Sequence, residues 1–198
     1  MGAMKTKATL LSILSVALVA GTLRAEDDAS AWPINLGLFP PVQIADAEDD
    51  VRGLQIGLLW DESRDLYGIS VGGLGNFAHR EMKGAELSLG CNWAESGYGI
   101  AWAGAFNRFG GDFSGWTRAI GANLCEGTLR GYQDALFSNY AHDLYGVQLG
   151  CVNTAHSAHG VQIGLVNLVE DMCGVQIGVL NFIRHGSLPF FPIVNACF

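Results

Sequence analysis

Large apolar side chains alternate with small or polar ones over most of the chain after residue 50. The segment Gly160–Gly164 reads Gly-Val-Gln-Ile-Gly. In similar segments the residues one, three and five after the first glycine are mostly large or apolar, and those two and four after it are small or polar. A period of two is typical of a β-strand with two unlike faces. No helical period competes with it beyond the N-terminal region, so the sequence predicts an all-β protein.

The alternation belongs to a tandem repeat. Gly146–Gly150, Gly160–Gly164 and Gly174–Gly178 are nearly identical, and Gly53–Gly57 is a weaker copy. A glycine leads a copy every 14 to 16 residues, at Gly53, Gly68, Gly84, Gly99, Gly115, Gly131, Gly146, Gly160 and Gly174. An asparagine follows seven or eight residues later in each copy but the first, at Asn76, Asn92, Asn107, Asn123, Asn139, Asn153, Asn167 and Asn181, and Asn195 ends a final half-copy. Asparagine tolerates left-handed backbone, so we interpret this position as a turn.

An antiparallel meander closed into a β-barrel of about ten to twelve strands fits this repeat, because a tilted membrane strand takes about 9–11 residues and leaves the remainder for a turn. In such a barrel Ile163 faces lipid and Gln162 faces the interior. The alternative is a β-solenoid, which explains identical residues at identical positions. Its return segments, such as Thr154–His159, are polar and offer little second wall. A soluble barrel or sandwich is a third possibility.

The C-terminus supports the barrel. The chain ends in Phe198, with Ala196 and Val194 alternating before it. A terminal aromatic residue on an alternating last strand resembles the signal by which outer-membrane barrels are recognised for insertion.

The repeats also resemble those of bacterial surface-repeat proteins that carry Gly-Val-Gln-Ile-Gly-Leu-Val-Asn type sequences. The resemblance rests on Gly53–Leu59, the three sharp C-terminal copies, Phe39–Val42 and Leu188–Pro192. It covers nearly all of residues 34–198 and is weakest from Gly97 to Tyr140. It implies export and an envelope or surface location, and it brings no activity and no functional residues.

The first 25 residues have the features of a secretory signal peptide, with Lys5 and Lys7, an apolar run from Ala8 to Leu23, and Ala25 at the cleavage position. We therefore divide the chain into a signal peptide (1–25), an N-terminal segment with a possible first strand and an acidic loop (26–52), and a repeat β domain (53–198). The predicted location is the outer membrane or the cell surface.

Charge and cysteine content exclude two classes of protein. Cleavage after residue 25 removes three basic residues and takes the formal charge from −8 to −11, which disfavours nucleic-acid binding. Five cysteines make an odd number without a CxxC pair, so no disulfide framework or paired-cysteine metal site is predicted.

No motif points to catalysis: the chain has no Gly-x-Ser-x-Gly, His-Glu-x-x-His or phosphate-binding loop. The five histidines fall in segments that we expect between strands. Of these, His156 and His159 are three residues apart, but a tetrahedral metal site needs more ligands than two. We predict no enzyme, and no catalytic, metal or cofactor-binding residues.

Aromatic residues gather in the centre of the chain, at Trp93, Trp102, Phe106, Phe109, Phe113 and Trp116. In a membrane barrel they belong near the lipid headgroups, and on an exposed sheet they would form a sugar-stacking platform. The leading hypothesis is a non-catalytic outer-membrane or cell-surface repeat protein, structural or pore-like, with the outer-membrane bilayer as its contact. The alternative is a surface-displayed repeat module that binds a glycan or protein partner.

Overall fold

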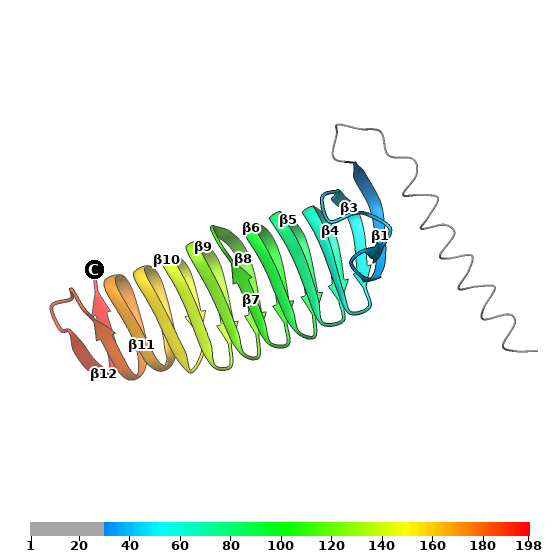
Figure 1. Ribbon diagram of the computed structural model, residues 1–198. Helices are drawn as coiled ribbons and strands as arrows, with labels where there is room; N and C mark the ends of the chain where they lie inside the picture. The colour runs from blue at the N-terminus through cyan, green and yellow to red at the C-terminus, as the bar shows by residue number, and fades with distance from the viewer. Residues whose placement is uncertain (1–29) are drawn as a thin grey trace, which may run out of the picture.

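The computed structural model describes residues 30–198 and shows a β-solenoid of about nine turns, with no helix among these residues (Figure 1). Each turn of the chain, here called a coil, lies directly on the one before it. The strands are β1 (Ala31–Phe39), β2 (Val42–Gln43), β3 (Asp50–Gly57), β4 (Trp60–Gly72), β5 (Gly75–Ser88), β6 (Cys91–Ala103), β7 (Phe106–Phe109), β8 (Phe113–Ala119), β9 (Ala122–Ala135), β10 (Ser138–Leu149), β11 (Val152–Ile183) and β12 (Phe190–Cys197).

The predicted closed barrel is wrong, whereas the all-β class and the solenoid alternative are correct. Strands from β3 to β11 pair in parallel, and equivalent repeat positions are register partners: Gly146 pairs with Gly160 and Gln148 with Gln162. One repeat therefore carries the chain through a full circuit and back to the same place in the next coil. In a meander, consecutive strands would run in opposite directions.

The repeated glycine is required where the coils touch. Gly160 has a φ of +149°, and a Cβ atom built on it would lie 1.9 Å from the carbonyl oxygen of Gly146. Both the backbone conformation and the close approach exclude a side chain at this position. All nine glycines that lead the copies have such positive φ values, from +134° to +152°.

The asparagines, which the sequence suggested to be turn residues, form a buried ladder. The Nδ2 atom of Asn153 donates to Oδ1 of Asn167 at 2.9 Å and to the backbone oxygen of Ile163 at 2.8 Å. The same side-chain bonds, 2.7 to 3.0 Å long, link Asn76, Asn92, Asn107, Asn123, Asn139, Asn153, Asn167 and Asn181 in order. Buried amides must find partners, and the next coil supplies them.

A second ladder occupies the interior of the C-terminal coils. Gln176 donates to Gln162, Gln162 to Gln148 and Gln148 to Gln133, each at 2.8 Å. All four side chains are fully buried. The third residue of the Gly-Val-Gln motif is therefore an interior residue that joins one coil to the next.

The return segments provide the second wall that the sequence suggested was missing. Ala155 and Ala158 point inward and are buried, whereas His156 and His159, each directly after one of them, point outward. Other inward residues of this wall include Met82, Leu129 and Leu144. The inward residues of this wall are few and often small, and polar outward residues separate them. The return segments therefore look polar in the sequence.

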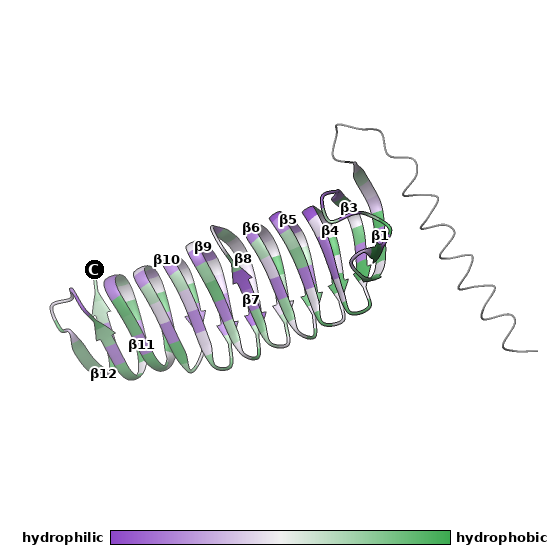
Figure 2. Cartoon of the chain, viewed as in Figure 1, coloured by the Kyte–Doolittle hydropathy of each residue, from purple (hydrophilic) through white to green (hydrophobic). Residues whose placement is uncertain are grey.

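The outer surface carries the large apolar side chains. Ile163 is 37% exposed and Gln162 is 0% exposed, the face assignment predicted for the barrel and opposite to that expected for a solenoid. Figure 2 shows hydrophobic segments recurring in successive coils. On this wall the inward positions hold small or polar side chains such as Gln162, whereas larger buried apolar residues such as Met82 and Leu129 lie on the second wall.

The two ends of the stack differ from its middle. β1, which contains Asn35–Leu38, pairs in parallel with β3, and β2 folds back on β1. β12 reverses direction and pairs antiparallel with β11, which places Asn195 beside Gln176 rather than at the end of the asparagine ladder. Phe198 follows β12 and is 92% exposed.

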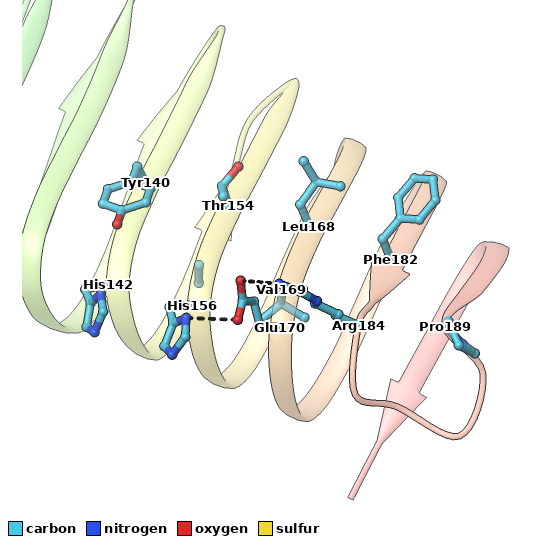
Figure 3. Close-up of a pocket in the computed structure, with 11 residues that line it drawn as sticks. Tyr140, His142, Thr154, His156, Leu168, Val169, Glu170, Phe182, Arg184 and Pro189 are labelled. Carbon is cyan, nitrogen blue, oxygen red and sulfur yellow. Dashed lines mark hydrogen bonds and ion pairs between the residues drawn. The ribbon is translucent and has the colours of Figure 1, made fainter.

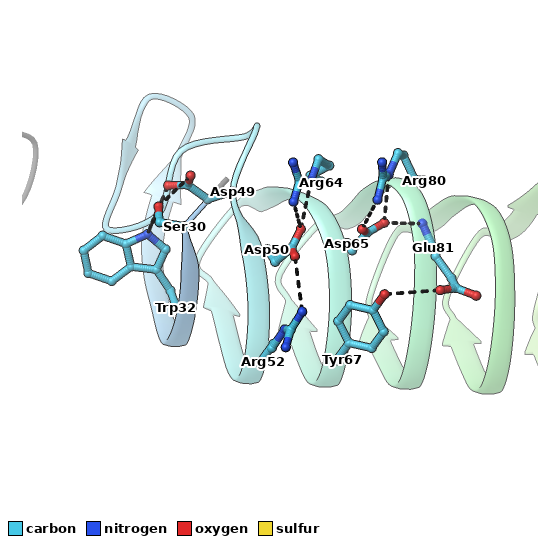
Figure 4. A network of polar contacts seen from close by, with 10 residues as sticks. All are labelled: Ser30, Trp32, Asp49, Asp50, Arg52, Arg64, Asp65, Tyr67, Arg80 and Glu81. Atoms are coloured by element: carbon cyan, nitrogen blue, oxygen red, sulfur yellow. Dashed lines mark hydrogen bonds and ion pairs between the residues drawn. The ribbon is translucent and has the colours of Figure 1, made fainter. Parts of the chain in front are cut away.

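The N-terminal coils are joined by polar contacts on their outer surface (Figure 4). Arg64 donates to Asp50 at 2.9 Å, Arg80 pairs with Asp65, and Trp32 Nε1 donates to Asp49 at 3.0 Å.

The predicted signal peptide lies outside the described residues. Within residues 30–198, no helix has the length and apolar character needed to cross a membrane.

Candidate functional site

An open groove of about 660 Å³ runs across the C-terminal coils, over β10, β11 and the loop that precedes β12 (Figure 3). It exists because equivalent outward residues stack from coil to coil. The residue after each ladder asparagine contributes to one side: Tyr140, Thr154, Leu168 and Phe182. The residue two further along contributes to the other side: His142, His156, Glu170 and Arg184.

The second side of this groove is a connected polar row. Glu170 accepts a hydrogen bond from Arg184 at 3.1 Å, and its other oxygen lies 3.3 Å from Nδ1 of His156. The rings of His142 and His156 stack, with centroids 4.9 Å apart and planes 11° from parallel. The groove therefore combines an apolar and aromatic row with a row of hydrogen-bonding and charged groups, and Pro189 also lines it.

The pair of histidines that the sequence offered as metal ligands is separated. His156 stacks on His142 in the groove, while His159 stacks on Tyr145 with ring centroids 4.8 Å apart. In residues 30–198 no three His, Cys, Asp or Glu side chains are placed to hold a metal ion. The periodicity explains the separation, because His159 occupies the outward position before Gly160 and His156 belongs to a different row.

The histidines do not generally lie between strands, as the sequence suggested. His79, His142, His156 and His159 are all within strands, because each strand bends around the coil instead of ending where the polar segment begins. His185 alone follows a strand, and its Nδ1 lies 3.0 Å from Oδ1 of Asp171. Both side chains of that pair are more than half exposed, an unfavourable setting for acid–base chemistry.

The central aromatic cluster predicted from the sequence divides between the interior and the surface. Phe109 and Phe113 are buried in the core, with ring centroids 4.1 Å apart. Trp93, Phe106 and Trp116 are exposed, and Trp102 is partly exposed on the outer surface. Alternation separates them, so they do not form a single stacking platform.

Two buried carboxyl groups, which the sequence did not single out, lie inside the N-terminal coils. Asp61 occupies the asparagine position of its coil and accepts hydrogen bonds from Gln55 Nε2 at 2.6 Å and from Ser70. Glu86 occupies the glutamine position between Ser70 and Ala101, and neither of its oxygens has a hydrogen-bond partner. The repeat frame could have identified both, since it aligns them with Asn76 and Gln148.

Burial controls the ionisation of these groups. It raises the pKa of Asp61 to about 7, although the hydrogen bonds from Gln55 and Ser70 act in the opposite direction. It raises the pKa of Glu86 well above its ordinary value, and the nearby Asp61 adds to the increase. Burial also raises the pKa of the Cys125 thiol to about 11, so that thiol is not activated as a nucleophile. All five cysteines are free.

Comparison with known proteins found no matching family model, no similar curated protein and no similar solved structure. The resemblance to surface-repeat proteins therefore remains a prediction.

Proposed function

We propose that this chain is an exported, non-catalytic repeat protein of the outer membrane or cell surface whose C-terminal groove binds an extended glycan. The observation that carries the proposal is the groove itself, in which four outward residues of one row face four of another across successive coils. A groove that follows the stacking direction suits a linear ligand better than a compact one. The signal-peptide pattern of residues 1–25 supports export.

The chemistry of the two rows favours a carbohydrate. Tyr140 and Phe182 present aromatic surface on which the apolar face of a sugar ring can lie. Across the groove, Glu170 supplies acceptors and Arg184 supplies donors for hydroxyl groups. Since this acid and this base already pair with each other, the polar row has no large excess of either charge.

A pore-like role required the closed barrel and has lost its structural basis. The interior of the solenoid is filled by ladder side chains such as Asn153 and Gln162, both fully buried. A surface-displayed module needs no channel, because its ligand binds to the outer surface of the coils.

Calorimetric titration of the mature chain with soluble oligosaccharides tests the binding proposal. We expect saturable binding to at least one linear glycan, with Tyr140→Ala and Phe182→Ala each weakening it about tenfold, as expected for loss of one buried aromatic contact. Phe77→Ala is the matched control, because Phe77 occupies the same row in β5, outside the groove. No binding across linear glycans of varied charge and linkage, or equal loss with the control, would contradict the proposal.

Fractionation tests the location independently of the ligand. We expect the mature chain in the envelope fraction and its exposed loops accessible to protease added to intact cells. Recovery in the cytoplasm, or in the soluble periplasm after lysis without detergent, contradicts the proposed location.

A further inference from the structure

Two outward rows of large side chains cross the sheet from end to end on the side between each glycine and the following asparagine. The first outer row consists of Ile34, Leu54, Ile69, Ala85, Ile100, Trp116, Tyr132, Val147, Val161, Val175 and Ala196. The second outer row consists of Leu36, Ile56, Val71, Leu87, Trp102, Arg118, Asp134, Leu149, Ile163, Ile177 and Val194. Together with the neighbouring leucines, such as Leu58 and Leu165, these rows form what we call the apolar face.

The size of the apolar face is that of a protein interface. Eleven strand segments spaced by about 4.8 Å give a length of about 48 Å, and three alternating positions along each segment give a width of about 13 Å. This footprint of roughly 600 Å² already approaches the ~800 Å² that each partner contributes to a standard interface. Single exposed apolar residues need no partner, but a continuous face of this extent does.

One pair of charged residues decides which partner suits this face. Arg118 and Asp134 are the only charged members of the two outer rows, and they lie next to each other, 3.5 Å apart, at the sixth and seventh of eleven positions. A lipid surface would meet a desolvated ion pair at the centre of its contact, with nothing to compensate it. A protein surface carrying the opposite arrangement would satisfy both charges.

The apolar face of a second copy carries that arrangement. If a two-fold axis runs parallel to the strands and passes between the sixth and seventh positions, Arg118 of each copy faces Asp134 of the other. Coils then overlap over ten of the eleven positions, with Leu87 opposite Ile163. An axis along the stacking direction would instead place Arg118 opposite Arg118. Aligned face-to-face packing of two sheets is a common arrangement, with the sheets about 10 Å apart.

We propose that the mature chain forms a homodimer in which two apolar faces pack together with their stacking directions antiparallel. The groove lies beyond the asparagine corner and stays open in this dimer, so the proposal does not depend on the proposed glycan. The two copies would present two grooves on one particle.

Sedimentation equilibrium of the mature chain tests the dimer. We expect twice the monomer mass at micromolar concentration, and a monomer for the double variant Leu87→Glu/Ile163→Glu. Leu87 and Ile163 are 38% and 37% exposed, so the variant should keep the β-rich circular dichroism spectrum of the fold. Tyr98→Glu is the matched control, since Tyr98 is exposed outside the apolar face and its variant should remain dimeric. A monomeric parent chain, or a dimer unaffected by the double variant, overturns the proposal.

Charge reversal tests the orientation. Arg118→Asp should weaken the dimer at least tenfold, because it places two acids opposite each other, and Asp134→Arg should do the same. The double exchange Arg118→Asp/Asp134→Arg should restore the affinity to within a few-fold of the parent. Equal affinity of all four proteins contradicts the antiparallel arrangement.

Cross-linking with a short bis-maleimide separates the dimer from lipid binding. In a background without native cysteines, Leu87→Cys/Ile163→Cys should yield a covalent dimer, since within one copy these positions are five coils, or about 24 Å, apart. Leu87→Cys alone should cross-link far less. Vesicles of neutral lipid should not bind the parent chain. A monomer that floats with vesicles and loses this property in Leu87→Glu/Ile163→Glu would show that the face binds lipid and would overturn the dimer.

Discussion

The coils led by Gly131, Gly146, Gly160 and Gly174 differ from the coils before them in what fills their interior. The C-terminal coils carry an unbroken Gln ladder, from Gln133 to Gln176, beside the Asn ladder. In the N-terminal and central coils Gln55 is followed at the Gln position by Ser70, Glu86, Ala101 and Thr117, and Asp61 begins the Asn row. Several buried polar atoms there have no partner, including both Glu86 oxygens, Ser88 Oγ and Thr117 Oγ1.

The two regions therefore differ in the interior hydrogen bonds that join one coil to the next. Where the Gln row is continuous, each Gln donates to the Gln of the coil before it, and the last three copies stay close to Gly-Val-Gln-Ile-Gly. Where the glutamines are replaced, other contacts join the coils, such as the ion pair of Arg64 with Asp50 on the surface. The two regions should therefore respond differently to matched substitutions.

The largest effect is expected at the coil contact itself. Gly160→Ala forces a Cβ atom to within 1.9 Å of the Gly146 carbonyl oxygen and requires a φ that alanine avoids. We expect a loss of at least about 4 kcal/mol in the free energy of unfolding, measured by urea denaturation. Gly111→Ala is the control. Its Cβ atom would lie 3.2 Å from the nearest atom, and we expect a loss below about 1 kcal/mol. Similar losses for both variants would show that the glycine contact has no special role.

Breaking the Asn ladder comes next. Asn153→Ala removes the bond to Asn167, one of the two bonds that Asn139 Nδ2 donates, and one of the two bonds that the Ile163 carbonyl accepts. We expect a loss of about 2–3 kcal/mol, because unpaired buried polar groups are costly. Thr154→Ala, on the adjacent outward position, should change the free energy of unfolding by less than about 0.5 kcal/mol. If Asn153→Ala proves as mild as Thr154→Ala, the ladder does not hold the coils together.

Replacing the two buried acids of the N-terminal coils by amides should stabilise the protein. Glu86→Gln and Asp61→Asn replace buried acids by the amides found at the equivalent positions, and we expect each to gain about 1–2 kcal/mol at pH 8. The parent chain binds protons at these sites more tightly when folded. Its stability should therefore fall as pH rises from about 4 to 7, the interval over which Asp61 ionises when unfolded but remains protonated when folded.

The measurement is thermal unfolding of the parent and both variants between pH 4 and pH 8. Each variant should reduce the fall in stability over this interval, and the two together should reduce it most. Serine at the same positions is a useful comparison, since Ser removes the charge without completing the ladder. A parent chain that becomes more stable from pH 4 to pH 7 would contradict the assignment of Asp61 and Glu86 as buried neutral acids.

The smallest effects are expected from ion pairs between coils. Burial alone would raise the pKa of Asp65, but the hydrogen bond from Arg80 and the backbone N–H of Glu81 lower it overall. Arg80→Ala should therefore destabilise the protein measurably at pH 7, because it removes the partner of the buried Asp65 carboxylate. Arg184→Ala should cost less than about 0.5 kcal/mol, because both members of its pair with Glu170 are exposed. Equal losses in urea denaturation would show that burial of Asp65 adds nothing.

The sequence predicted strands, repeat boundaries and the two unlike faces, because alternation and a 14- to 16-residue period are local properties. It correctly assigned Gln162 to the interior and Ile163 to the outside, although it made this assignment for a closed barrel. The direction of strand pairing could not be predicted, since a meander and a solenoid share the same period. The inward Ala155 and Ala158 were obscured by the polar residues between them, and the polar return segment therefore argued against a second wall.

The groove escaped prediction for a related reason. Tyr140, Thr154, Leu168 and Phe182 are 14 residues apart, and their proximity follows only once the strands are known to be parallel and in register. Glu86 and Asp61 were visible as exceptions to the repeat. The repeat pattern alone does not show that the face of the strand that carries the amide side chains is the buried one. The residues that the sequence did consider together, His156 and His159, lie on different outward rows.

The parallel, in-register stacking of coils is the central claim, and one pair of engineered cysteines tests it directly. Val147 and Val161 are register partners on the outer surface of neighbouring coils. Their Cα atoms are therefore about 4.8 Å apart, within the range that a disulfide spans. With the native cysteines removed, Val147→Cys/Val161→Cys should oxidise rapidly to an intramolecular disulfide, whereas Val147→Cys/Leu165→Cys should not, because four residues of extended strand offset that pair by about 13 Å. In an antiparallel hairpin turning near Ser157, residue 147 would lie beside residue 165 instead. Disulfide formation in the second pair and not in the first would contradict the solenoid.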